Sequence, residues 1–157
     1  MSRESAPLGG RQWPSLDLRA GALPWRLVNG EPEYLLIRRR GQAGWAIPKG
    51  HLMAFRAIGE AAQLEAHEEA GVRGSIGDQS IGSYIHIKAS VFKGRQSEAV
   101  EVIVFPLEVD GMESQWPEMD VRERRWARPS EVPALVASEK LRDLIMAFSP
   151  ASAAVAA

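Results

Sequence analysis

Three glutamates at helical spacing are the residues of this sequence best placed to do chemistry. Glu65, Glu68 and Glu69 are three and four positions apart, so a helix through this segment would present them on one face. Like charges at this spacing destabilise a helix, and the helix dipole makes negative charge unfavourable in the last turns before Gly71. Residues 57–72 contain no Lys or Arg that could offset these charges. The cluster therefore needs a cation from elsewhere.

Metal binding is the chemistry that such a cluster suits. Carboxylate oxygens are hard ligands for Mg²⁺ or Mn²⁺, and Mg²⁺ is usually held by one or two carboxylates together with substrate phosphates. A solvated acidic face is the alternative for any pair of glutamates, but such a face normally alternates in sign along the helix. The pattern therefore favours a site that binds Mg²⁺, with Mn²⁺ as the alternative, and that processes phosphates.

Three consecutive arginines upstream of the glutamates are candidates for phosphate binding. The apolar segment 34–37 predicts a strand that runs into Arg38, Arg39 and Arg40. Because successive side chains of a strand point to opposite faces, Arg38 and Arg40 share one face and Arg39 points to the other. The planar guanidinium group binds phosphate through paired hydrogen bonds. We therefore expect Arg38 and Arg40 to bind substrate phosphates.

Three further candidates follow a short predicted strand at 44–48, which a proline ends. Lys49 supplies a flexible point charge for phosphate. Gly50 has no Cβ, so its backbone can approach a ligand closely and its carbonyl oxygen could reach a metal. His51 is a candidate metal ligand or phosphate donor, with ordinary solvated polarity as the alternative reading.

Length and composition indicate one ordinary globular domain. The 157 residues are 45% hydrophobic and 25% charged, which suits a single core. A net charge of −1 gives no general attraction to nucleic acid or to an anionic membrane, so phosphate binding must come from local clusters. The absence of cysteine excludes disulfides and thiol chemistry. Because no signal peptide or membrane helix is recognisable, we expect a cytoplasmic protein.

Hydrophobic patterns predict a mixed sheet covered by helices, on one face or on both. The sequence has no repeat and no linker, so residues 1–157 are expected to form one domain, with 1–12 and 149–157 as flexible tails. Pro24 suggests a sheet edge or a bulge in the first strand. Strands are predicted at 16–28, 34–37, 44–48, 81–91, 99–109 and 122–127, helices within 50–72, 129–136 and 138–148, and a hairpin loop at 93–96.

The segment 50–72 resembles the Nudix box. That motif reads Gly, five residues, Glu, seven residues, and then Arg-Glu-aliphatic-x-Glu-Glu-x-Gly-aliphatic. The matching positions are Gly50, Glu65, Glu68, Glu69, Gly71 and Val72, with Ala66 at the first aliphatic place. Arg56 stands where the family has Glu, and Leu64 stands where it has the Arg that helps to orient the catalytic carboxylates. A missing orienting residue typically costs about 10–100-fold in metal affinity or activity, unless Arg56 or another Arg compensates.

The resemblance implies a fold, a reaction and roles for the site residues. The implied fold is α/β, a Nudix-type α/β/α sandwich with a mixed, partly antiparallel central sheet. The implied reaction is cleavage of a diphosphate or polyphosphate linkage by a water molecule that Mg²⁺ activates. The expected catalytic residues are Glu65, Glu68, Glu69 and Glu118, the expected metal ligands are Gly50, Glu65, Glu68 and Glu69, and the expected phosphate-binding residues are Arg38, Arg40, Lys49 and His51.

Segments outside the glutamate cluster suggest two substrate classes. The chain is similar to bacterial members of the diphosphoinositol polyphosphate phosphohydrolase-like subfamily at three segments, which are Trp116-Pro117-Glu118, Arg125-Trp126 and Pro129-Ser130-Glu131. Pro48-Lys49-Gly50-His51 is similar to diadenosine polyphosphate hydrolases. Arg56 and Leu64 favour a different function, a degenerate Nudix domain that binds a phosphorylated ligand or a protein partner without turnover. Neither nucleic acid nor a membrane is an expected partner, and a monomer and a homodimer both fit the sequence.

Overall fold

The computed structural model describes residues 16–88 and 98–150 of the chain. The predicted tail 1–12, the predicted hairpin loop 93–96 and the predicted tail beyond residue 150 lie outside the described residues. The strands are β1 (Asp17–Val28), β2 (Glu31–Arg39), β3 (Lys49–His51), β4 (Val72–Ile76), β5 (Gly82–Lys88), β6 (Glu98–Met112) and β7 (Arg122–Ala127), and the helices are α1 (Ile58–Ala70), α2 (Val132–Leu135) and α3 (Glu139–Ala147). None of these helices has the length and apolar character needed to span a membrane.

The strands form one mixed, seven-stranded sheet, as predicted. Its main path is β4–β6–β1–β2–β7, while β3 pairs with β1 and β5 pairs with β6. The central strands β1 and β6 run parallel, and the other pairs are antiparallel. Because β1 and β6 each pair with three strands, they hold the sheet together and fix the positions of the shorter strands around them.

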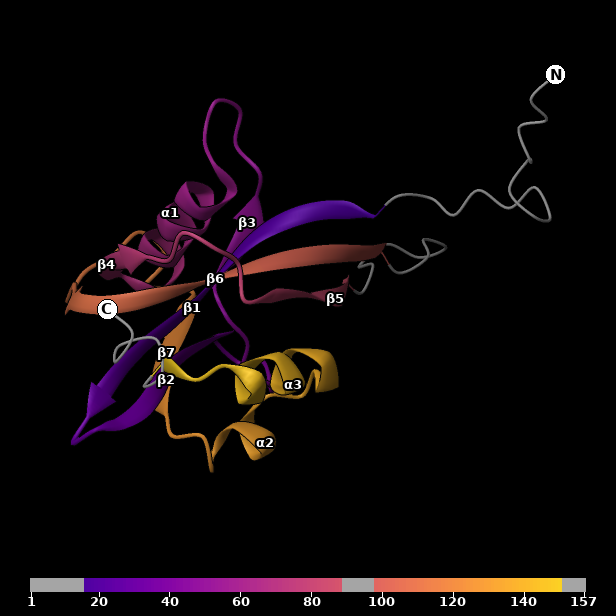
Figure 1. The fold of residues 1–157 in the computed structure, drawn as a ribbon. Helices are drawn as coiled ribbons and strands as arrows, with labels where there is room; N and C mark the ends of the chain where they lie inside the picture. The colour runs from indigo at the N-terminus through magenta and orange to yellow at the C-terminus, as the bar shows by residue number, and fades with distance from the viewer. Residues whose placement is uncertain (1–15, 89–97, 151–157) are drawn as a thin grey trace, which may run out of the picture.

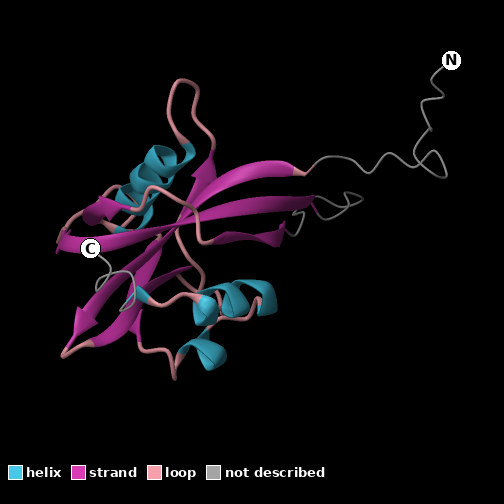
Figure 2. Ribbon diagram, in the orientation of Figure 1, coloured by secondary structure: helices cyan, strands magenta, loops and turns pink. Residues whose placement is uncertain are grey.

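Helices cover both faces of the sheet, so the fold is the predicted α/β/α sandwich (Figures 1 and 2). On one face α1 packs against a cluster that includes Leu35 and Ile37 of β2. On the other face α2 and α3 contribute Val132, Leu141 and Ile145 to a second cluster. The sheet is therefore buried from both sides, and its ends and loops are left to form sites.

Small side chains let α1 lie close to the sheet. Buried alanines of the helix and of β1 belong to the same core cluster, and side chains of a single carbon allow a close approach of helix and strand. These alanines are Ala61, Ala62, Ala66 and Ala70 of α1 with Ala20 and Ala22 of β1. The helix ends at Gly71, whose φ of 65° is left-handed, a conformation that glycine adopts without strain. The polar face of α1 is thereby held beside β3.

The prediction that Pro24 marks a sheet edge or a bulge is wrong, since β1 is a central strand without a register shift. One side of β1 changes partner near this proline, from β3 at 19–21 to β2 at 25–28. The N–H of Ala22 donates to Pro48 on that same side, and an N–H at position 24 would point the same way. The N–H that proline lacks at position 24 would therefore lie between the β3 and β2 ladders, where this side of β1 has no paired residue.

Two short segments also differ from the prediction. Residues 44–48 form only isolated bridges, Ile37 with Ala46 and Trp45 with Val136, and the short strand β3 follows them. Strand β4 was not predicted. It contains a register shift between Arg73 and Gly74, which interrupts the alternation that identifies a strand in sequence.

Candidate active site

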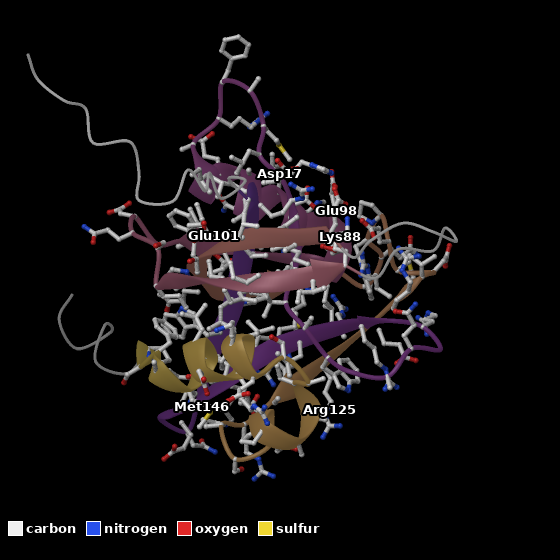
Figure 3. All side chains as sticks on the ribbon, turned by 90° about the vertical axis from the view of Figure 1, so that its right-hand side faces the viewer. Asp17, Lys88, Glu98, Glu101, Arg125 and Met146 are labelled. Atoms are coloured by element: carbon white, nitrogen blue, oxygen red, sulfur yellow. The ribbon has the colours of Figure 1, made fainter. Side chains whose placement is uncertain are left out.

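A cavity of about 400 Å³ opens where α1 faces β3 and the ends of the central strands. Its acidic side chains are Glu65, Glu69 and Glu118. Its basic side chains are Arg19, Arg39, Lys49, Lys88 and Arg122, with His51 and His86. Figure 3 shows Lys88 at this end of the sheet, near the first residues of β1 and β6, which are labelled Asp17 and Glu98. The cavity thus brings most of the predicted site residues together.

Glu69 is the most deeply buried of the acidic side chains, with 4% of its surface exposed. Its Oε1 accepts a hydrogen bond from the backbone N–H of Lys49 at 2.9 Å. Its Oε2 pairs with Nη2 of Arg122 at 2.8 Å. Burial raises the pKa of Glu69, and the Lys49 N–H and the Arg122 guanidinium oppose that rise. Part of the charge of the cluster is therefore offset by the protein itself.

Arg122, the first residue of β7, joins two carboxylates of the cavity. While its Nη2 pairs with Glu69, its Nε donates to Oε1 of Glu118 at 3.0 Å. Glu118 lies in the loop between β6 and β7, as expected from the sequence. The loop, the strand and the helix therefore meet at one guanidinium group.

The segment 113–124 also caps the C-terminal end of α1. The carbonyl groups of residues 68–71 each accept a hydrogen bond from this segment, so carbonyls that lack helical partners are satisfied. The donors are the backbone N–H groups of Glu113 and Glu118, the indole N–H of Trp116 and the guanidinium of Arg124, at 2.7–3.1 Å. The guanidinium of Arg124 lies 3.9 Å from the centre of the Trp116 ring. This cap fixes the turn that carries Glu68 and Glu69.

Glu65 lies against the backbone of Gly50. A Cβ built on Gly50 would overlap the carboxylate of Glu65, so only glycine leaves room for this arrangement. Burial first, and then the charges of Glu69, Glu68 and Glu118, raise the pKa of Glu65 to about 7, while Arg122 opposes that rise. A carboxyl group with this pKa can exchange a proton near neutral pH.

The basic groups of the cavity are partly desolvated. Burial lowers the pKa of Lys49, and the nearby Glu69 opposes that effect. Burial also lowers the pKa of His86 to about 4, with smaller contributions from Lys49 and Lys88. The imidazole of His86 is therefore neutral at physiological pH, and the cavity's positive charge comes from Lys and Arg.

Two predicted phosphate-binding residues lie outside this cavity. Arg38 of β2 and Arg40, which follows the end of this strand, both pair with Glu123 of β7, through N–O distances of 2.5 and 3.8 Å. Arg38 also lies over the ring of Trp45, 4.5 Å from its centre, and lines an adjoining hollow. Arg39, which points to the opposite face, lines the cavity instead. Lys49 and His51 line the cavity as expected.

Five further basic residues of the cavity are absent from the sequence-based site. Their signals in the sequence were weak: His86 and Lys88 share the polar face of an alternating strand, and Arg122 begins a strand rich in arginine. Neither pattern indicates which sheet face lies beside the glutamates. The five residues are Arg19, Arg39, His86, Lys88 and Arg122.

The chemistry of the donors fits a hard divalent cation. Gly50 offers a carbonyl oxygen, and Glu65 has a pKa raised first by burial and then by neighbouring carboxylates whose charge a cation would offset. Within residues 16–88 and 98–150, however, no three His, Cys, Asp or Glu side chains are already arranged to hold a metal. Both oxygens of Glu69 bind protein donors, and Glu68 is exposed outside the cavity lining.

Comparison with known sequences identifies relatives over most of the chain. Residues 17–148 match the NUDIX domain. Nudix hydrolase 21, chloroplastic, of Arabidopsis thaliana is 33% identical over 134 residues, which cover 82% of this chain and 64% of that protein. Nudix hydrolase 13, mitochondrial, of the same plant is 30% identical over 153 residues, which cover 83% of this chain and 72% of that protein. The chain thus spans about two thirds of the length of these relatives.

Solved structures have a similar fold. The C. elegans Ap4A hydrolase binary complex superposes with a TM-score of 0.61 at 19% identity, over 90% of this chain and 98% of that chain. The NUDIX domain of Shewanella oneidensis NrtR, complexed with ADP ribose, superposes with a TM-score of 0.60 at 13% identity, over 86% and 88% of the two chains. With the match over residues 17–148 and the shared α/β/α sandwich, the chain belongs to the Nudix family.

Proposed function

We propose that this Nudix domain is a divalent-metal-dependent pyrophosphohydrolase that cleaves a diphosphate or polyphosphate linkage in a small, multiply phosphorylated substrate. The observation that carries the proposal is the presence of Glu65, Glu69 and Glu118 in one cavity with five Lys and Arg side chains. Phosphoryl transfer depends mainly on positioning and on compensation of negative charge. A cavity with acidic groups for a metal and basic groups for phosphates can supply both.

The proposed roles follow from where each group lies. Gly50, Glu65 and Glu69 of the cavity, together with the exposed Glu68 of the same helix that the Nudix box implies, would hold Mg²⁺ or Mn²⁺. When bound, the metal offsets charge on the phosphoryl oxygens and acidifies a water molecule. Glu65, which lies against Gly50 in the cavity, is the proposed acceptor of the proton of the attacking water. Lys49 lies beside Glu69 in the cavity and is suited to hold a substrate phosphate near the glutamates.

The lining of the cavity favours a diphosphoinositol polyphosphate over a dinucleoside polyphosphate. Proteins commonly hold a base by stacking it on an aromatic side chain. Among the described residues that line this cavity there is no Phe, Tyr or Trp, whereas Arg and Lys side chains come from β1, β2, β3, β5 and β7. A substrate with phosphates in several directions uses such an arrangement fully. The Ap4A named for the C. elegans structure represents the competing class.

The experiment that tests this function offers purified protein both substrate classes with Mg²⁺. We expect release of phosphate from a diphosphoinositol pentakisphosphate to exceed cleavage of diadenosine tetraphosphate, and Glu69→Gln to stop turnover. Glu60→Gln is the matched control, because Glu60 is an exposed residue of the same helix outside the cavity. Turnover that survives Glu69→Gln would exclude the assignment, and a preference for diadenosine tetraphosphate would reverse the choice of substrate.

Binding without turnover is a second function that one observation favours. Because Glu69 already has protein partners at both oxygens, its charge is offset by the protein, and the cavity can serve as an anion-binding site alone. That function predicts a higher unfolding temperature with inositol hexakisphosphate and no product from either substrate. Any turnover that depends on Glu69 would dismiss it.

The absence of cysteine suits a reducing compartment, and the cytoplasm is part of our proposal.

A further inference from the structure

The helix that carries the glutamates lacks an orienting arginine of its own. The family has an Arg at the position of Leu64, and an apolar side chain there cannot bind a carboxylate. Arg56, the basic residue nearest to the helix in sequence, pairs with Glu60 at 4.0 Å and is half exposed. It therefore lies at the start of α1, away from the turn that carries Glu68 and Glu69. A different residue must fix the buried carboxylate of Glu69.

Arg122 has the geometry that this task requires. Its side chain is 20% exposed, and that of Glu69 is 5% exposed, so their contact at 2.8 Å is largely shielded from water. A second edge of the same guanidinium binds Glu118 at 3.0 Å. The rigid, planar group of arginine can hold two carboxylates in a fixed relation, which the single ammonium group of lysine cannot do.

The carboxylate of Glu69 is fixed only when both of its oxygens are bound. The Lys49 N–H holds Oε1, and Arg122 holds Oε2. With Oε1 alone bound, the carboxylate can rotate about that single hydrogen bond. A reacting or metal-binding group that is displaced by about 1 Å can lose about 100-fold in rate.

We propose that Arg122 is a positioning residue that orients Glu69 from β7, in place of the arginine that the helix lacks at Leu64. The inference rests on the proposed function, because it assigns Arg122 to that same site. It explains how a Nudix domain with Leu64 keeps an ordered carboxylate in the cavity. It also gives Glu118 a defined part, since Glu118 holds Arg122 in place from the neighbouring loop.

A direct contact between Arg122 and a substrate phosphate is the competing explanation, because Arg122 also lines the cavity. The two explanations differ in what a substitution changes. Loss of a positioning residue lowers kcat and the affinity for metal in the absence of substrate. Loss of a phosphate contact raises KM and leaves the affinity for metal alone unchanged.

The decisive variant is Arg122→Lys, which keeps the charge and removes the planar group. We measure kcat and KM with Mg²⁺ on the better of the two substrates above, and the affinity for Mn²⁺ alone by titration calorimetry. We expect kcat and Mn²⁺ affinity each to fall about 10–100-fold, with KM unchanged. Arg125→Lys is the matched control, because Arg125 is on the same strand, pairs with the partly exposed Glu131 and lies far from Lys88 in Figure 3.

Unchanged kcat and Mn²⁺ affinity in Arg122→Lys would overturn the inference, and so would a higher KM with unchanged Mn²⁺ affinity. A second comparison guards against a folding defect. If Arg122 acts through Glu69, adding Arg122→Lys to Glu69→Gln has no further effect on Mn²⁺ affinity, whereas a full additional loss would show an independent role. If the wild type binds Mn²⁺ but turns over neither substrate, the proposed function fails, and the Mn²⁺ affinities alone still decide the role of Arg122.

Discussion

Gly50 is the residue on which the position of Glu65 depends most directly. Its φ is not left-handed, so alanine is compatible with the backbone at this position. The added Cβ would overlap the carboxylate of Glu65, which is the flexible end of a side chain and can move away. The displacement affects chemistry more than folding, because the helix and the sheet need not shift.

Gly50→Ala is expected to lower kcat about 100-fold, while the free energy of unfolding changes by less than about 1 kcal/mol. Steady-state kinetics and urea unfolding measure the two effects. Gly111→Ala is the control, since the atoms nearest to its Cβ would be those of the exposed guanidinium of Arg73, outside the cavity. Wild-type kcat in Gly50→Ala would show that Glu65 does not need this contact.

At the residue level, the sequence predicts that Glu65 and Glu69 lie close together, but it predicts neither that Glu68 lies outside the cavity lining nor how Glu69 is paired. Spacing along one helix places Glu65, Glu68 and Glu69 on a common face, because that relation is local. The partner of Glu69 comes from β7, so its identity depends on the register of the sheet rather than on spacing. The prediction that the cluster needs a cation from outside its helix is met for Glu69 by Arg122.

At the scale of elements, the C-terminal cap of α1 connects the stability of the fold to the site. Arg124 donates to the carbonyl groups of Ala70 and Glu113 and lies over Trp116. The indole N–H of Trp116 in turn holds the carbonyl of Glu69. Loosening this cap would free the turn that carries two of the glutamates.

Arg124→Gln is expected to lower the free energy of unfolding by about 1–3 kcal/mol, because two carbonyl groups lose a charged donor. We also expect a lower kcat, since the last turn of α1 becomes less ordered. Arg125→Gln on the same strand serves as the control, because its ion pair with Glu131 is screened by solvent and contributes little to stability. Equal unfolding free energies for the two variants in urea titrations would contradict the assignment of the cap.

Pairing between strands also bears on why Arg38 and Arg40 lie outside this cavity. Alternation correctly separates Arg39 from Arg38 and Arg40, but it does not say which face lies beside α1. In the structure, Leu35 and Ile37, which share the face of Arg39, pack with α1. Arg38, on the other face, is opposite Glu123 of β7 and pairs with it. A role of Arg38 and Arg40 in binding phosphate stays a prediction, and Arg39 is the better placed candidate.

At the scale of the whole molecule, the fold class was predictable and the distribution of charge was not. Hydrophobic patterns indicated a mixed sheet with helices, and the resemblance to the Nudix box implied the sandwich that the structure has. The net charge of −1 gave no sign of a cavity lined by basic groups from five strands. Because these groups are far apart in sequence, only the folded chain gathers them.

His86, which lies in this cavity with Lys49 and Lys88, makes the stability of the fold depend on pH. The pKa of His86 is lowered from 6.5 to about 4, first by burial and then by Lys49 and Lys88. Between these two values the unfolded chain binds a proton that the folded chain does not. Stability from His86 is therefore fully present above pH 6.5 and is lost as the pH falls towards 4. The raised pKa of Glu65 acts in the opposite direction within part of this range.

The contribution of His86 is isolated by comparing urea unfolding of the wild type and His86→Asn from pH 7 to pH 4. We expect the wild type to lose more stability than the variant as the pH falls, because asparagine cannot take up a proton in the unfolded state. His67→Asn is the control, since His67 is exposed on α1 and does not line the cavity. Parallel pH profiles for the wild type and His86→Asn would show that His86 is not desolvated, and the cavity would then hold one more cation for phosphate below neutral pH.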